Sequence, residues 1–152
     1  MSDNTYTLAI SVATQRISCA YFINDTPYDW RISEAASQSV ITAHAATVEW
    51  LNYYNPNRLI LERLADSRKG SYTRELNTAI GQAAHDQQIN TVYVTHVQHY
   101  ANKYLEAEAL AERFPELKPC LPKPRQPWEA EPRDVRVFAA VSLGLAALNA
   151  GT

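Results

Sequence analysis

The order of two kinds of hydrophobic pattern constrains the fold of this chain most strongly. Three short apolar runs with the composition of strands come first, at Thr7 to Ala13, Arg16 to Ile23 and Tyr28 to Ile32. Asn24 to Pro27 lies between the last two and has the residues of a tight turn. Strands joined by such short connections predict an antiparallel meander at the start of the fold.

After the meander the hydrophobic period changes to that of a helix. Ser33 is the predicted N-cap of a long helix, and this helix must end near Asn55 because Pro56 disfavours the helical conformation at the residue before it. The remaining elements alternate. We expect strands at Arg58 to Leu64 and Thr91 to Thr95, and helices at Gly70 to Gln88, Gln98 to Phe114 and Val135 to Leu148.

This order predicts an α/β fold with a mixed five-stranded sheet, in which three antiparallel strands are followed by αβ units and helices cover both faces. The length of 152 residues suits a single domain, 1–152. Within it, residues 115–130 form a proline-rich loop, and we expect neither regular helix nor sheet from Pro115 to Pro127.

Composition excludes several classes of protein. A net charge of −2 argues against a protein that coats nucleic acid by charge alone, and four glycines leave no glycine-rich phosphate loop. Cys19 and Cys120 lie far apart and are predicted to be free thiols in a reducing compartment. The polar start, and the absence of any run near the roughly 18 apolar residues that span a bilayer, predict a cytoplasmic protein without membrane contact.

Three segments carry a resemblance to a known family. Leu8 to Ala13 is an apolar first strand, Leu59 to Glu62 is a strand that ends in a carboxylate, and Ala79 to Ala83 places a glycine within the second helix. Together with the order of elements, these segments resemble the ribonuclease-H-like superfamily, and most closely the RuvC-type Holliday-junction resolvases. The resemblance implies a site for Mg²⁺ in which carboxylates from several elements converge to support phosphodiester hydrolysis.

The resemblance assigns Glu62 a catalytic and metal-binding role, and it fails at the first strand. Ser11 stands where the family has a metal-binding Asp, and no Asp or Glu occurs between Asn4 and Asn24. A hydroxyl carries no charge to offset two divalent cations, so the acidic site is degenerate at this position. The alternative role for Glu62 is an ion pair with a nearby base such as Arg58 or Arg63, or simple exposure beyond the sheet.

The start of the last helix can be aligned with the family in two ways. Glu131 and Asp134 have the spacing of the paired acids in resolvases, which makes both catalytic candidates and Asp134 a metal ligand. They also suit a helix N-terminus, where negative side chains are favoured. The other alignment matches Phe138 to Val141 with the family's acidic run and places Ala139 at the acid's position.

Two basic and aromatic stretches are candidates for binding nucleic acid, because cations contact phosphates and aromatic rings stack on unpaired bases. Each has a simpler reading, the first as a solvated surface and the second as a linker or a strip that docks a partner. The first comprises Arg63, Arg68, Lys69, Tyr72 and Arg74, and the second includes Lys123 and Arg125.

Three functions therefore remain open. The first is a RuvC-like protein associated with branched or structured DNA, with an incomplete metal site and weak or no nuclease activity. The second is an active Mg²⁺-dependent endonuclease whose remaining acids, with a displaced one such as Asp66, rebuild the site. The third is a protein-interaction scaffold without a role on nucleic acid. The resemblance also implies a homodimer, since resolvases cut symmetrically as dimers.

Overall fold

The computed structural model describes residues 4–13, 15–64, 70–95, 103–121 and 135–150. Its centre is a five-stranded sheet with the strand order β3-β2-β1-β4-β5. The strands are β1 (Tyr6–Val12), β2 (Ile17–Ile23), β3 (Thr26–Ser33), β4 (Arg58–Glu62) and β5 (Asn90–Val94). The first three are antiparallel neighbours, whereas β4 pairs parallel with both β1 and β5. The predicted mixed sheet, which begins with a meander, is confirmed.

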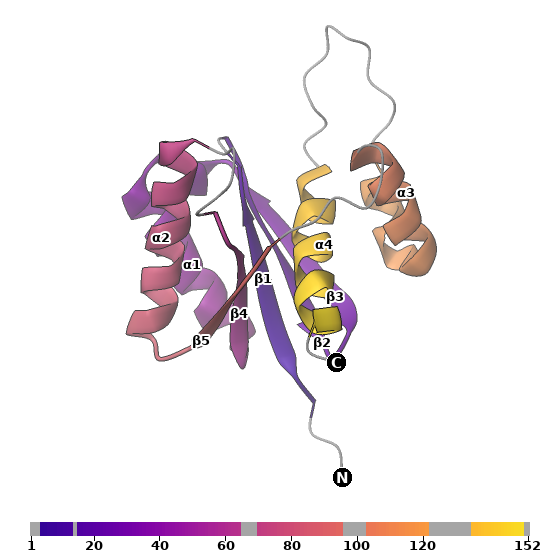
Figure 1. The fold of residues 1–152 in the computed structure, drawn as a ribbon, viewed down its shortest axis with the longest axis horizontal. Coiled ribbons are helices and arrows are strands. Elements are labelled where there is room, and N and C mark those ends of the chain that lie inside the picture. The colour runs from indigo at the N-terminus through magenta and orange to yellow at the C-terminus, as the bar shows by residue number, and fades with distance from the viewer. Residues whose placement is uncertain (1–3, 14, 65–69, 96–102, 122–134, 151–152) are drawn as a thin grey trace, which may run out of the picture.

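Helices cover both faces of the sheet, as expected (Figure 1). On one face lie α1 (Val40–Tyr54) and α2 (Ser71–Asp86), whose buried side chains join Leu8, Ile10 and Leu61 in one core. On the other face lie α4 (Val135–Ala150) and α3 (Lys103–Arg113), which share a second core with Ala9, Phe22 and Ile60. Because side chains alternate along a strand, each central strand contributes to both cores.

Ser33 is not the N-cap of the long helix, which corrects the prediction. Ser33 ends β3, and its Oγ accepts a 3.0 Å hydrogen bond from the amide of Ala36 at a short 3-10 turn, η1 (Ala35–Gln38). Ser39 caps α1 instead, through reciprocal bonds with Thr42 that satisfy two amides at once. The predicted end is confirmed, since Asn55 takes the left-handed conformation and its amide bonds to Leu51.

The proline-rich segment is more regular at its start than predicted. Pro115–Cys120 forms a 3-10 helix, η2, and buries Leu117 against the core beside α3 and α4. Proline is tolerated there because the first residues of a helix need no amide donor. Residues 122–134 lie outside the described part of the chain, as do residues 96–102 at the predicted start of α3. None of the helices in the described ranges is long and apolar enough to cross a membrane.

Candidate functional site

The carboxyl ends of β1 and β4 lie side by side at the same end of the sheet. The strands are parallel, and Ile10 pairs with Leu61, so Ser11 and Glu62 are the next residues in the same register. Ala9 and Ile60 belong to the core under α4, and Ser11 and Glu62 follow each of them by two positions. Both side chains therefore point to the α4 face of the sheet, with Ser11 buried at 4% exposure and Glu62 partly exposed.

The amino end of α4 reaches this same place. Ser18 pairs with Ser11 across β1 and β2, and its Oγ donates a 2.7 Å hydrogen bond to the carbonyl oxygen of Arg136 in the first turn of α4. This bond spans 118 residues of sequence and positions the start of the helix beside Ser11. The structure thus brings together three elements that the resemblance assigned to one site: the ends of β1 and β4 and the beginning of α4.

The backbone of Glu62 is held from two sides. Its carbonyl oxygen accepts a 3.1 Å hydrogen bond from Nδ2 of Asn77, a buried residue of α2. The amide of the next residue, Arg63, donates to the carbonyl of Val94 at 2.8 Å and extends the ladder between β4 and β5. These contacts restrict where the Glu62 carboxylate can lie, because side-chain position depends on a fixed backbone.

Among the described residues, Glu62 is the carboxylate that the ends of β1 and β4 provide. No group of three or more His, Cys, Asp or Glu side chains that could hold a metal ion occurs within the described ranges. Ser11 offers a neutral hydroxyl, which accepts and donates hydrogen bonds but adds no negative charge. Glu131 and Asp134, the two predicted acids of the last helix, lie outside the described residues.

Of the predicted nucleic-acid-binding residues, some lie in the described part of the chain and others lie outside it. Arg63 and Arg74 are exposed, and Tyr72 donates a 2.6 Å hydrogen bond from its hydroxyl to the carbonyl of Ser37 while its ring stays 37% exposed. Tyr72 therefore ties the start of α2 to η1 and keeps an accessible ring. Four others lie outside the described residues: Arg68, Lys69, Lys123 and Arg125.

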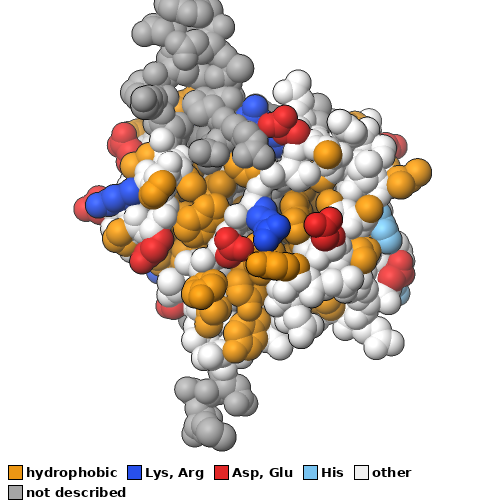
Figure 2. All heavy atoms as spheres, turned by 180° about the vertical axis from the view of Figure 1, so that it is seen from behind, with side chains coloured by type: hydrophobic (Ala, Val, Ile, Leu, Met, Phe, Trp, Pro, Cys, Tyr) orange, Lys and Arg blue, Asp and Glu red, His pale blue; other side chains and the backbone are white. Residues whose placement is uncertain are grey.

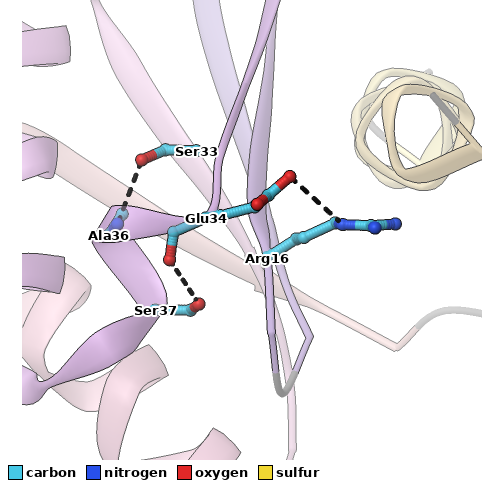
Figure 3. Close-up of polar contacts among 5 residues, drawn as sticks. All are labelled: Arg16, Ser33, Glu34, Ala36 and Ser37. Carbon is cyan, nitrogen blue, oxygen red and sulfur yellow. Dashed lines mark hydrogen bonds and ion pairs between the residues drawn. The ribbon is translucent and has the colours of Figure 1, made fainter. Parts of the chain in front are cut away.

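Sequence reasoning missed two cations near this end of the sheet. Arg136 lies in the first turn of α4, and its Nε is buried. Arg16 lies in the turn after β1, where its carbonyl accepts from the amide of Ala13, and its Nε is 3.8 Å from a carboxylate oxygen of Glu34 (Figure 3). The signal for Arg136 was available, since a charged residue in an otherwise apolar helix usually has a specific environment.

Glu34 is in turn held by η1, which Figure 3 shows beside the ion pair. Ser37 donates a 2.8 Å hydrogen bond from its hydroxyl to the carbonyl of Glu34, and the amide of Ser37 bonds to the same oxygen at 3.2 Å. Arg16 is therefore partly neutralised by a carboxylate on a fixed turn, which reduces the positive charge that it offers to a phosphate.

Comparison with known proteins supports the fold. No family model matches the sequence, and no curated protein sequence matches it. Among solved structures, Thermus thermophilus RuvC superposes with a TM-score of 0.66 at 13% identity, over 97% of this chain and 96% of that one. T. thermophilus RuvC in complex with a Holliday-junction substrate gives a TM-score of 0.64 at 12% identity, with the same coverage. The chain therefore has the ribonuclease-H-like fold in its RuvC form.

Proposed function

We propose that this chain is a RuvC-like protein of the cytoplasm that associates with branched or structured DNA and has weak or no metal-dependent nuclease activity. One observation carries the proposal. At the end of the sheet where Glu62 and the start of α4 meet, the first strand contributes the buried hydroxyl of Ser11 in place of a carboxylate. A likeness in fold to a protein bound to a Holliday junction supports the choice of nucleic acid.

The residues present fit one divalent cation better than two. Glu62, with Asp134 and Glu131 from the segment that enters α4, would hold Mg²⁺ through the oxygen ligands that this ion prefers. A bound Mg²⁺ supplies Lewis acidity toward a phosphate oxygen and lowers the pKa of its water. Ser11 adds no charge for a second ion, and the loss of one ligand from such a site usually lowers its activity by orders of magnitude.

The DNA backbone would be contacted by the basic residues that follow β4. Arg63 and Arg74 are exposed near Glu62 in sequence, and Tyr72 offers an accessible ring between them. Arg68 and Lys69 extend this set, and Lys123 with Arg125 would form a second strip. Contacts of this kind bind phosphates without reading sequence, which suits recognition of DNA by its shape.

A second copy of the chain is part of the proposal. A junction with two equivalent strands needs two sites for symmetric contact, and a two-fold homodimer provides them. The dimer would let a modest positive surface on each copy act twice on one DNA molecule, which raises the overall affinity without a new contact.

The test measures binding and cleavage of a synthetic four-way DNA junction with Mg²⁺ or Mn²⁺. We expect salt-dependent binding by the wild type, little cleavage, and weaker metal binding by Glu62→Gln in calorimetry. Glu49→Gln, an exposed carboxylate on α1, is the matched control and should behave as the wild type. Cleavage by the wild type that Glu62→Gln abolishes would establish the active endonuclease instead. Absence of junction binding at low salt would establish the scaffold.

A further inference from the structure

Strand β5 is an edge of the sheet, and its outer side offers main-chain groups for hydrogen bonding. The carbonyl oxygen of Val94 accepts a 2.8 Å hydrogen bond from the amide of Arg63, so the main chain of Val94 faces β4. Because these groups alternate in direction along a strand, Thr91 and Tyr93 point their amides and carbonyls away from the sheet. Within the described part of the chain, no hydrogen bond is made to these four groups. An extended chain along β5 would find two donors and two acceptors.

The opposite edge of the sheet, β3, has features that discourage an added strand, and β5 lacks them. β3 contains Pro27, Asp29 and Arg31, and Figure 2 shows acidic and basic side chains among hydrophobic ones on the side of the molecule where β3 lies. Both charges are held in place, since Nε of Arg31 donates to the hydroxyl of Tyr54 at 3.1 Å and that hydroxyl donates to Asp29 at 2.7 Å. β5 has neither proline nor charge in its sequence, Asn-Thr-Val-Tyr-Val. Since proline and charges protect edge strands from pairing, β5 is the edge suited to accept a strand.

An open cavity of about 570 Å³ lies beside this edge, between β5 and α2. Thr91 and Tyr93 line it from the strand, and Gly81 and His85 line it from the helix. Gly81 permits a close contact, because a Cβ there would lie 2.6 Å from the hydroxyl oxygen of Tyr93, whose side chain remains 44% exposed. The volume falls in the range of about 300–1,000 Å³ that is typical of ligand pockets. The same two residues of β5 therefore provide both the outward main-chain groups and one wall of the cavity.

The cavity has the chemistry of a site for uncharged side chains. Among the described residues that line it, none is Lys, Arg, Asp or Glu. Ile89 and the ring of Tyr93 offer apolar surface, and Asn90 offers a neutral polar group. A phosphate would meet neither Lys nor Arg there, and a charged side chain would meet no strong counter-charge. A large apolar or aromatic side chain fits these walls best.

We propose that an extended segment of a partner protein pairs with β5 as a sixth strand and inserts large uncharged side chains into this cavity. Main-chain hydrogen bonds to Thr91 and Tyr93 supply the affinity, and the cavity selects the side chains, as in other proteins that bind peptides by strand addition. Side chains alternate along the added strand as they do along β5, so every second one lies on the α2 face of the sheet, beside the cavity.

This peptide site goes beyond the proposed DNA binding and does not depend on it. The cavity lies on the α2 face of the sheet, whereas Ser11 and Glu62 point to the α4 face. A partner protein and a nucleic acid could therefore be bound at the same time.

The test begins with a phage-displayed library of random seven-residue peptides, selected on the full chain. We expect the enriched peptides to carry large uncharged side chains two positions apart. The most enriched peptide is synthesised, and its Kd is measured by fluorescence anisotropy. Thr91→Pro removes an outward amide and no bond to β4, so it should weaken peptide binding about tenfold or more. Thr91→Val keeps the amide and is the matched control, which should bind as the wild type does.

Two further comparisons distinguish strand addition from non-specific apolar binding. His85→Trp fills the cavity from α2 and should weaken binding by a similar factor, whereas Gln82→Trp adds the same ring at an exposed position of the same helix and should not. In the peptide, every second amide faces β5. Methylation of one alternate set of peptide amides should therefore abolish binding, and methylation of the other set should preserve it.

The absence of any enriched peptide, equal affinity of the wild type and a folded Thr91→Pro, or equal effects of the two methylated sets would each overturn the proposal. The methylated peptides are measured on the wild type, so they decide the question even if Thr91→Pro does not fold. Single-stranded DNA that displaces the peptide would make the cavity a nucleic-acid site instead. Self-association of the wild type that Thr91→Pro abolishes would make a second copy the occupant, and either result overturns the partner peptide.

Discussion

The neighbouring strands β1 and β4 are parallel and in register, and side chains at equivalent positions of both strands point to the α4 face. The last of these side chains differs between the two strands. β1 lies at the centre of the sheet, and its last side chain on that face is the buried Ser11. The equivalent side chain of β4 is the partly exposed Glu62. A buried carboxylate without a cation is costly, while a carboxylate that reaches water is not. A carboxylate would therefore be more costly at the end of β1 than at the end of β4.

Ser11→Asp tests this contrast most directly and should have the largest effect. Without divalent ions we expect a loss of about 3–5 kcal/mol in the free energy of unfolding, because an uncompensated charge is buried beside Glu62. Added Mg²⁺ should recover part of this loss by binding between the two carboxylates. Urea unfolding with and without Mg²⁺ measures both effects. Ser11→Asn, which adds similar bulk without charge, should not respond to Mg²⁺.

Gly144→Ala tests how closely α4 must approach the β1 side of the sheet. A methyl group at this position would overlap the ring of Phe22 on β2 and would lie 3.2 Å from Cβ of Ala9 on β1. Both neighbours are fully buried, so we expect a loss of about 1–3 kcal/mol from overpacking. Gly70→Ala, where no atom lies within 4 Å, is the control: at this N-cap of α2 it meets no overlap and should change stability by no more than about 1 kcal/mol. Equal effects in chemical denaturation would contradict the tight contact.

Ser18→Ala sharpens the comparison at the site itself. The variant loses the hydrogen bond to the carbonyl of Arg136, which should cost about 1 kcal/mol and loosen the first turn of α4. Hydrogen exchange of the α4 amides measures the local effect. Ser37→Ala removes a bond of the same kind to the carbonyl of Glu34 and should leave α4 exchange unchanged. Similar exchange in both variants would mean that Ser18 does not position the helix.

The smallest expected effect is on the reactivity of Cys19, whose side chain lies on the face of β2 opposite to that of Ser18. Burial, more than any other cause, raises the pKa of its thiol from 9.0 to about 12. Because the folded pKa is raised, its contribution to stability is complete below pH 9 and is lost as the pH rises toward 12. At pH 8 we expect the half-buried Cys120 to be alkylated and Cys19 to be protected. Equal alkylation of both thiols in the folded protein would contradict this.

Most of the fold followed from local patterns, and the errors arose where two local signals competed. The runs around Ile10 and Ile60 were long and apolar enough to identify as central strands. Ser33 and Ser39 were both good helix caps, and only the reciprocal bond with Thr42 selects Ser39. Pro115 suggested irregular chain, whereas the burial of Leu117 stabilises a 3-10 turn there.

The candidate site was predictable only in part. Glu62 could be identified because a charge at the end of a buried strand is unusual, and Ser11 because the resemblance marks its position. Arg136 and Ser18 could not be paired from sequence, since their hydrogen bond joins residues that are 118 positions apart. The network of Asp29, Arg31 and Tyr54 was also hidden, because it joins β3 to the end of α1.

The sequence by itself determined the order of strands and helices, the mixed sheet and the absence of an acid from the first strand, because these depend on residue identity and short-range spacing. The tertiary structure decided that Ser11 and Glu62 share one face, that α4 begins beside them, and that Asp29 and Arg31 both bond to the hydroxyl of Tyr54. These relations come from strand register and helix packing, which bring together residues that no local pattern connects.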